Sequence, residues 1–448
     1  MWLRTSSLRA PDMGIIAGVL ATADRGHMLG ALATFSKKSP DQWCPAGHPA
    51  NDGQLPDWRT LSSVPTQHAI EAVAAAAPNH CIDGWSYASR ALSAVLAGDS
   101  HAARHLAYYA QLRAGLSILA NLGIGIFNRT NFVVTAAGTI ARLDTSPRRN
   151  GPGLGTHDVV WEALKDWASD AQTSRVFLEL VKIRGTSLKD CLDAIWPGMP
   201  AAGAATTLIE AWGVDLRRGK DEHKNRNISS YSPQAMNPLA AIAPDGLRFV
   251  EGFWRLFEPT SGSSFDNVDR FLLRSLLLKQ HRTVAGNMDY GNGAIASRYD
   301  ELPASIRGLT SVEFLTNAQQ PRSPELLQRA NSTTLPASAT EMLARAFLLL
   351  RVATAFTHSS FVEAGFSSAD GDLRPWIDPW AEARGFWAPA CPLADPIDLW
   401  IDVELAMIEF LESLDPEPSS MNDWMKKHAK GLPTLYEAER VGVWSLCA

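Results

Sequence analysis

The most regular pattern of hydrophobic positions lies over residues 100–122. Leucine and tyrosine recur there at steps of three and four residues, which places them on one face of an α-helix. Asp99 or Ser100 supplies the N-cap, and Gly123 ends the helix. We expect this continuous apolar stripe to be buried against other helices. It consists of Leu106, Tyr109, Leu112, Leu116 and Leu119.

Further helical segments follow from the same periodicity and termination signals. Thr66 caps a predicted helix that Pro78 and Asn79 stop, and a second helix is expected over residues 85–97. The sequence therefore predicts a mainly α-helical protein. Its other predicted helices cover residues 157–168, 176–183, 188–195, 204–216, 265–281, 339–356 and 397–414.

One short stretch interrupts the helical pattern. Residues 132–135 and 139–143 alternate between apolar and polar side chains, with Gly138 between them, which predicts a small β-hairpin. Gly123 and Gly125 precede this stretch. Because they follow a helix and lack a third glycine, we interpret them as a helix end and a turn and not as a phosphate-binding loop.

Segments rich in proline, glycine or polar residues divide the chain into four predicted parts. They are an irregular N-terminal segment (1–65), a helical domain (66–285), a linker (286–335) and a C-terminal helical domain (336–448). A chain of 448 residues is long enough for two or three domains. The predicted fold class is mainly α: a helical bundle with a small β-hairpin and a C-terminal helical region.

Composition and charge limit the partners. The formal net charge of −6 gives no global attraction for nucleic acid, so any RNA contact has to come from a local basic patch. No apolar run reaches the ~18 residues of a membrane span. The apolar run over residues 13–21 is only marginally long for a secretion signal, and Pro11 and Asp12 interrupt its approach. We therefore expect a cytoplasmic protein without membrane contact.

The cysteines and histidines predict no metal site. Five widely spaced cysteines without a CxxC pair support neither a zinc ribbon nor a disulfide framework. Cys44 and His48 could face one metal ion, although a structural role is more frequent for such a pair in a segment rich in proline and glycine. No metal and no cofactor is predicted.

The candidate chemistry lies in a charged stretch over residues 218–231. On a helix, His223, Arg226, Asn227 and Ser230 share one face. An imidazole that transfers a proton near neutral pH then lies beside a guanidinium that binds phosphate. Such a pair could cleave a phosphodiester without a metal ion, because Arg226 would stabilise the developing charge while His223 acts as acid or base. A solvated surface helix shows a similar density of charge.

Two further groups of polar side chains could take part. Arg148 and Arg149 lie in a loop flanked by glycines and could contact a nucleic-acid backbone. Arg104, together with His101 and His105, forms a polar face on the helix predicted from residue 100. That face would complete the candidate site if its helix packs against the charged stretch. Ordinary solvated side chains are the alternative for both groups.

The charged stretch resembles the signature of the HEPN domain, in which an arginine and a polar residue are followed at a short distance by histidine or tyrosine. The pair Tyr108 and Tyr109, followed by alanine, resembles the aromatic helix that opens many HEPN-like bundles. Residues 155–164 and 226–233 resemble a group of bacterial HEPN-like proteins. The resemblance covers residues 66–285 and implies a HEPN-like helical bundle.

The resemblance also implies a function. HEPN proteins are common in bacterial defence and toxin–antitoxin systems, and their active members are metal-independent RNases whose composite site forms where two copies meet. It thereby implies RNA and a second copy of the chain as partners. His223, Arg226 and Asn227 would be catalytic, and Arg218 and Tyr231 would assist them.

The chain departs from the family pattern in both possible registers. The register that starts at Arg218 has His223, but Gly219 replaces the polar second residue. The register that starts at Arg226 has a polar neighbour, but Tyr231 stands in place of the histidine, and tyrosine is a poor proton shuttle at neutral pH. The second hypothesis is therefore a non-catalytic helical scaffold or sensor subunit that uses the same fold to dimerise or to recruit a protein partner.

Overall fold

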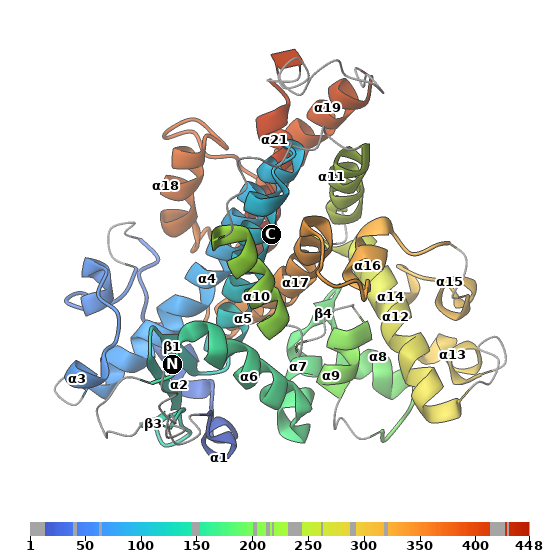
Figure 1. The fold of residues 1–448 in the computed structure, drawn as a ribbon. Coiled ribbons are helices and arrows are strands. Elements are labelled where there is room, and N and C mark those ends of the chain that lie inside the picture. Colours follow the sequence, from blue (N-terminus) through green and yellow to red (C-terminus); the bar gives the residue numbers. More distant parts are fainter. Residues whose placement is uncertain are drawn as a thin grey trace, which may run out of the picture.

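The fold is mainly α-helical, as the sequence predicts, with a small antiparallel sheet beside the helices (Figure 1). It is seen in a computed structural model that describes residues 14–38, 43–61, 65–145, 153–199, 204–211, 216, 219–231, 244–260, 263–286, 293–317, 321–412, 426–427 and 430–447.

Three long helices form the centre of the molecule: α4 (Thr66–Leu96), α5 (Ser100–Ala120) and α17 (Ala339–Glu363). The side chain of Asp99 caps α5 by accepting from the backbone N–H groups of His101 and Ala102. Helix α5 packs against both α4 and α17, so it is covered on more than one side. Leu112, Leu116 and Leu119 of its predicted stripe are buried, whereas Leu106 and Tyr109 are partly buried. A second face consists of alanines without exposed surface, Ala103, Ala107, Ala110 and Ala114. Small side chains on this face let the neighbouring backbones approach closely.

Helix α4 runs through Pro78, where the sequence predicts a stop. Proline cannot donate to the carbonyl four residues earlier and costs a helix interior about 3 kcal/mol. The helix is buried on both sides of Pro78, since Ala74 and Ala77 have no exposed surface and Ile82 is 8% exposed. The packing of this continuous apolar face outweighs the local cost, so the two predicted helices are one.

The small sheet contains β1 (Ile124–Phe127), β2 (Thr130–Val134) and β3 (Ile140–Arg142) in that order. The predicted hairpin is confirmed as β2–β3, which pairs Phe132 with Arg142. Gly123 ends the preceding helix at φ +81°, as expected. The interpretation of Gly125 as part of a turn is wrong, because it lies in β1, where a Cβ would come within 2.8 Å of Val73.

Short helices occupy the N-terminal segment that the sequence predicts to be irregular. Met28 and Leu32 bring this segment into the main hydrophobic core. Its elements are α1 (Ala17–Leu20), α2 (Gly26–Leu32), the 3-10 helix η1 (Pro49–Asp52) and α3 (Trp58–Leu61).

The middle of the chain surrounds one side of the central helices (Figure 1). The predicted helix over residues 176–183 ends earlier than expected, because residues 182–187 form a tight two-stranded ribbon. The elements are α6 (Thr156–Ser169), α7 (Ala171–Leu180), β4 (Lys182–Ile183), β5 (Thr186–Ser187), α8 (Leu188–Ile195), α9 (Ala204–Ala211), α10 (Gly219–Tyr231), α11 (Pro244–Phe257) and α12 (Asp266–Ala285).

The C-terminal half shares its core with the rest of the molecule. The largest cluster of buried side chains includes residues from Leu20 to Leu446 and so passes through all four predicted parts. The predicted boundaries stay predictions. The remaining elements are α13 (Ala294–Ser297), η4 (Tyr299–Glu301), α14 (Ala304–Arg307), α15 (Val312–Thr316), α16 (Glu325–Ala330), α18 (Arg374–Arg384), η5 (Pro396–Asp398), α19 (Leu399–Glu412), α21 (Leu432–Tyr436) and α22 (Glu439–Cys447).

The described helices were also compared with the requirements of a bilayer. None of them combines the length and the apolar character that spanning a membrane demands.

Candidate functional site

The charged stretch forms α10, which packs against α5 and α6 in front of the central helices (Figure 1). Gly219 starts this helix against the face of Trp161. A Cβ at Gly219 would lie 2.3 Å from Cδ2 of the indole, so only glycine lets α10 approach this closely. The residue that departs from the HEPN pattern thus has a packing role.

Two bonds join the polar face of α5 to α10. Arg104 donates from Nη1 to Ser229 Oγ at 3.0 Å, and His105 Nδ1 lies 2.7 Å from Ser230 Oγ. Arg104 also donates to the carbonyl of Ala337, just before α17. The helix that carries this polar face therefore packs against the charged stretch, which is the condition under which its side chains could belong to the candidate site. The bonds of Arg104 also tie this predicted RNA contact into the packing of three helices.

The centre of the site is a group of stacked rings from three helices. His157 of α6 stacks on His223 of α10, with ring centroids 4.6 Å apart and planes 15° apart. Tyr108 of α5 stacks on His223 at 5.5 Å and 18°. Trp161 Nε1 donates to the hydroxyl of Tyr108 at 3.3 Å. Residues distant in sequence therefore converge on one point.

Arg226 closes this group. It is only 7% exposed, and its guanidinium carbon lies 5.5 Å from the ring centroid of Tyr108 and 5.3 Å from that of Tyr109. Its Nη2 lies 3.4 Å from Nε2 of His157, and its Nε has no hydrogen-bond partner among the described residues. Within the described part of the chain, Arg226 forms no ion pair with a carboxylate. We call Tyr108, His157, His223 and Arg226 the α10 cluster.

The contacts of His157 define its tautomer. Arg226 can only donate, so His157 Nε2 has to accept, and the ring proton lies on Nδ1. Nδ1 is 2.9 Å from the hydroxyl of Tyr108 and donates to it. The lone pair of Nε2 is therefore directed at the guanidinium, where a bound anion would also lie.

Burial and positive charge keep the imidazoles neutral. Burial, with help from His223 and Arg226, lowers the pKa of His157 to about 4, and Asp158 opposes this shift. Burial and then Arg226 likewise lower the pKa of His223, again against Asp158. Burial raises the pKa of the Tyr108 hydroxyl. At neutral pH the cluster thus contains two neutral imidazoles, a protonated phenol and one guanidinium charge.

The other predicted site residues lie around this centre or outside the described residues. Asn227 is partly buried on α10 next to Arg226, whereas Tyr231 is 79% exposed at the end of the helix. Arg218, Arg148 and Arg149 lie outside the described residues.

Sequence reasoning did not select His157, Tyr108 or Trp161 as site residues. Tyr108 and His157 belong to stretches on which the family resemblance rests, but neither stretch indicates that the two side chains meet. The available signal was the spacing of His157 and Trp161, which puts the two side chains on the same face of one helix. Spacing within one helix does not identify partners on other helices.

A cavity of about 420 Å³ opens beside the cluster. His157 and Tyr109 form part of its wall, together with His80 and Arg113. Arg113 donates to His80 Nδ1 at 2.9 Å, and burial followed by the charge of Arg113 lowers the pKa of His80 to about 3. Polar side chains therefore continue from the α10 cluster into a space that can hold part of a ligand.

The described residues contain no group of three or more histidine, cysteine or acidic side chains arranged to hold a metal ion. His48, considered with Cys44 as a metal ligand, has its Nε2 2.8 Å from the carbonyl of His68 and 3.5 Å from Glu71. Burial raises the pKa of the Cys44 thiol to about 12. His48 is thus held by a backbone carbonyl and a carboxylate, and Cys44 is a buried thiol.

Comparison with protein-family models, with curated proteins and with solved structures gives no significant match for the chain.

Proposed function

We propose that the chain binds RNA and cleaves it at the α10 cluster without a metal ion, as an effector of a bacterial defence or toxin-type system in the cytoplasm. The observation that carries this proposal is the environment of Arg226. A buried guanidinium is normally balanced by a carboxylate, whereas this one contacts aromatic rings and a neutral imidazole. Such a charge can be balanced by a phosphate, which it binds with a bidentate geometry.

The reaction would be a transfer of the phosphodiester to the neighbouring ribose hydroxyl. When a bound phosphate accepts from Arg226, Nη2 of Arg226 leaves His157 Nε2. This nitrogen then takes the proton of the 2′-hydroxyl, whose oxygen forms a bond to phosphorus. The bond from phosphorus to the 5′-oxygen breaks, and His223, in its protonated form, gives that oxygen a proton. The products are a 2′,3′-cyclic phosphate and a 5′-hydroxyl. Arg226 stabilises the charge on the phosphoryl oxygens.

The arrangement of the cluster supports these roles. The bond between Tyr108 and His157 Nδ1 holds the ring with its lone pair on Nε2, as a base requires. A bound phosphate would offset the charge of Arg226, which lowers the pKa of His223, and so favour protonation of that imidazole. The homodimer implied by the resemblance belongs to the same proposal, and light scattering on the purified protein would measure it.

Incubation of the purified protein with total RNA in EDTA tests the proposal. We expect cleavage by the wild-type protein, with 2′,3′-cyclic phosphate ends, and a loss of about a hundredfold in rate for His157→Ala and for Arg226→Lys. Lys224→Ala is the matched control, because Lys224 lies on the same helix with a side chain 76% exposed. Its rate should stay close to that of the wild type.

The outcomes separate the alternatives. Cleavage that is equal in all variants would come from a contaminant, and absence of both cleavage and RNA binding would overturn the proposal in favour of a scaffold or sensor subunit. RNA binding that depends on Arg226 without cleavage would retain the binding site and reject the reaction. Circular dichroism on each variant checks that the helices are intact.

A further inference from the structure

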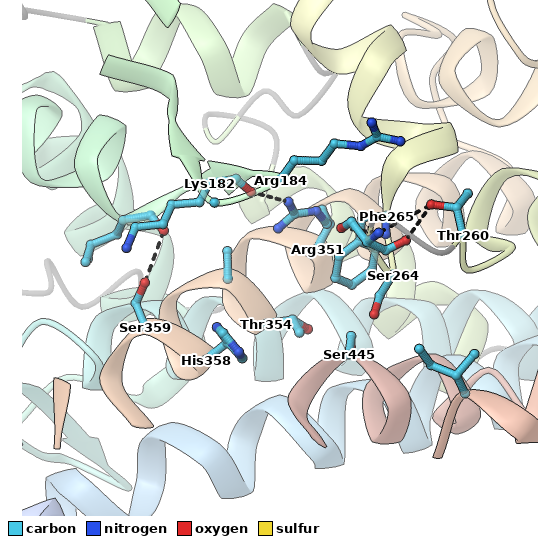
Figure 2. Close-up of a pocket in the computed structure, with 15 residues that line it drawn as sticks. Lys182, Arg184, Thr260, Ser264, Phe265, Arg351, Thr354, His358, Ser359 and Ser445 are labelled. Carbon is cyan, nitrogen blue, oxygen red and sulfur yellow. Dashed lines mark hydrogen bonds between the residues drawn. The ribbon is translucent and has the colours of Figure 1, made fainter. Parts of the chain in front are cut away.

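A second cavity, of about 360 Å³, lies apart from the α10 cluster and shares none of its residues. Figure 2 shows Lys182 and Arg184 along its upper side and Thr354, His358 and Ser445 along its lower side, with Arg351 and Ser264 between them. The ribbon β4–β5, the segment before α12, and helices α17 and α22 therefore all contribute to one cleft.

Among the described residues, every ionisable side chain that lines this cleft is basic. Two of them are balanced by acidic residues behind the wall. Arg184 donates to both oxygens of Asp266, and Arg351 donates to both oxygens of Asp269 at 2.9 and 2.7 Å. Lys182 has no ion pair among the described residues, and its side chain is exposed. The cleft thus presents a net positive charge to its contents.

Three donors in the cleft have no partner among the described residues. Arg351 is 3% exposed, and the bonds of its guanidinium involve Nε and Nη2 only, which leaves Nη1. Ser264 is 8% exposed, and its hydroxyl makes no hydrogen bond in the described part of the chain. The third donor is the ammonium of Lys182. Arg351 Nη1 and the Ser264 hydroxyl line the cleft together with the exposed Lys182, so all three can donate to an acceptor that enters it.

We propose that this cleft binds a small molecule that carries a phosphate monoester. The described lining holds a guanidinium, an ammonium and a hydroxyl from three different elements and no acidic side chain, which suits a phosphate with two negative charges better than a carboxylate with one. Leu180, Phe265 and Ile397 provide apolar wall for the rest of the ligand. The volume lies at the lower end of small-molecule pockets, which favours a metabolite over a polynucleotide.

Calorimetric titration of the full-length protein in a phosphate-free buffer tests this site. The probes are inorganic phosphate and glucose 6-phosphate, with glucose and acetate as the neutral and carboxylate comparisons. We expect both phosphates to bind, and Lys182→Glu and Ser264→Ala to weaken them by about tenfold or more, because each change removes a donor to a charged group. Arg351 is left unchanged, since its pairing with Asp269 also supports the fold.

Two control variants separate this cleft from other sites. Lys165→Glu reverses a charge on α6 at a side chain that is 51% exposed, and Arg226→Met removes the guanidinium of the α10 cluster. Both should retain the binding that Lys182→Glu and Ser264→Ala weaken. The proposal is overturned if the wild-type protein binds neither phosphate at millimolar concentration, if acetate binds as tightly, or if Lys182→Glu and Ser264→Ala bind like the wild type. Loss of binding in Arg226→Met alone would assign the phosphate to the α10 cluster and would also overturn it.

Discussion

Arg351 in the second cleft and Arg226 in the α10 cluster are similarly buried, at 3% and 7% exposure, but their surroundings differ. Arg351 is matched by Asp269, which accepts two bonds from it. Arg226 contacts two tyrosine rings and the acceptor nitrogen of His157. Asp269 offsets the charge of Arg351, which makes this arginine part of the fold and leaves only Nη1 for a ligand, whereas no carboxylate among the described residues offsets the charge of Arg226. The pairing of an arginine, more than its burial, thus indicates its role.

The largest expected effect comes from removing the partner of Arg351. Asp269→Asn keeps the size of the side chain but leaves a buried guanidinium uncompensated, so we expect the free energy of unfolding to fall by about 3–5 kcal/mol. Arg226→Met, which strands no carboxylate among the described residues, should change it by less than about 1 kcal/mol. Urea unfolding curves measure both. Equal losses in the two variants would contradict the distinction between the two arginines.

A smaller effect is expected from the contact that sets the distance between α10 and α6. Gly219→Ala would place a methyl group against Trp161, and such overpacking costs about 1–3 kcal/mol. Because the clash displaces the helix that carries His223 and Arg226, RNA cleavage should fall as well. Gly252→Ala is the control, since a Cβ there meets nothing within 4 Å and alanine favours the interior of α11. Unaltered stability and cleavage in Gly219→Ala would show that α10 does not depend on this approach.

The smallest effect concerns pH. A base with an ordinary histidine pKa of about 6.5 would be half protonated at that pH and lose about half of its activity. The pKa of His157 is lowered to about 4, so His157 stays neutral well below pH 6.5, and on the acidic side of the profile activity should decline only as the pH falls toward 4. A profile of kcat/KM for RNA cleavage measures this limb in the free enzyme. A half-loss near pH 6.5 would mean that the α10 cluster does not hold its imidazoles in the neutral form.

The sequence predicted what depends on neighbouring residues. The periodic leucines and the Asp99 cap define α5, and the alternation after Gly138 defines the β2–β3 hairpin, because these signals act over a few residues. The helix break at Pro78 was predicted wrongly for the same reason. Proline does destabilise a helix interior, but the burial of α4 outweighs this cost, and that burial comes from helices elsewhere in the chain.

The candidate site was predicted on one of its sides only. His223 and Arg226 share a helical face and were found together, whereas His157 and Tyr108 reach them through tertiary packing. The sequence could not predict the carboxylate partner of Arg351 either, because Asp269 lies 82 positions away. A sequence gives the number of arginines and carboxylates but not which of them meet.

The packing of α17 on α5 has a consequence for how the chain folds. Glu222 of α10 is 3% exposed and lies 2.6 Å from Arg345 of α17, which is 2% exposed. During synthesis, α5 and α10 leave the ribosome long before α17, so α5 lacks one of its two main packing partners and Glu222 lacks Arg345 until more than three quarters of the chain exists. Contacts between such distant segments form late and slow folding. The helix that carries His223 and Arg226 therefore lacks one of its buried anchors until α17 has been synthesised.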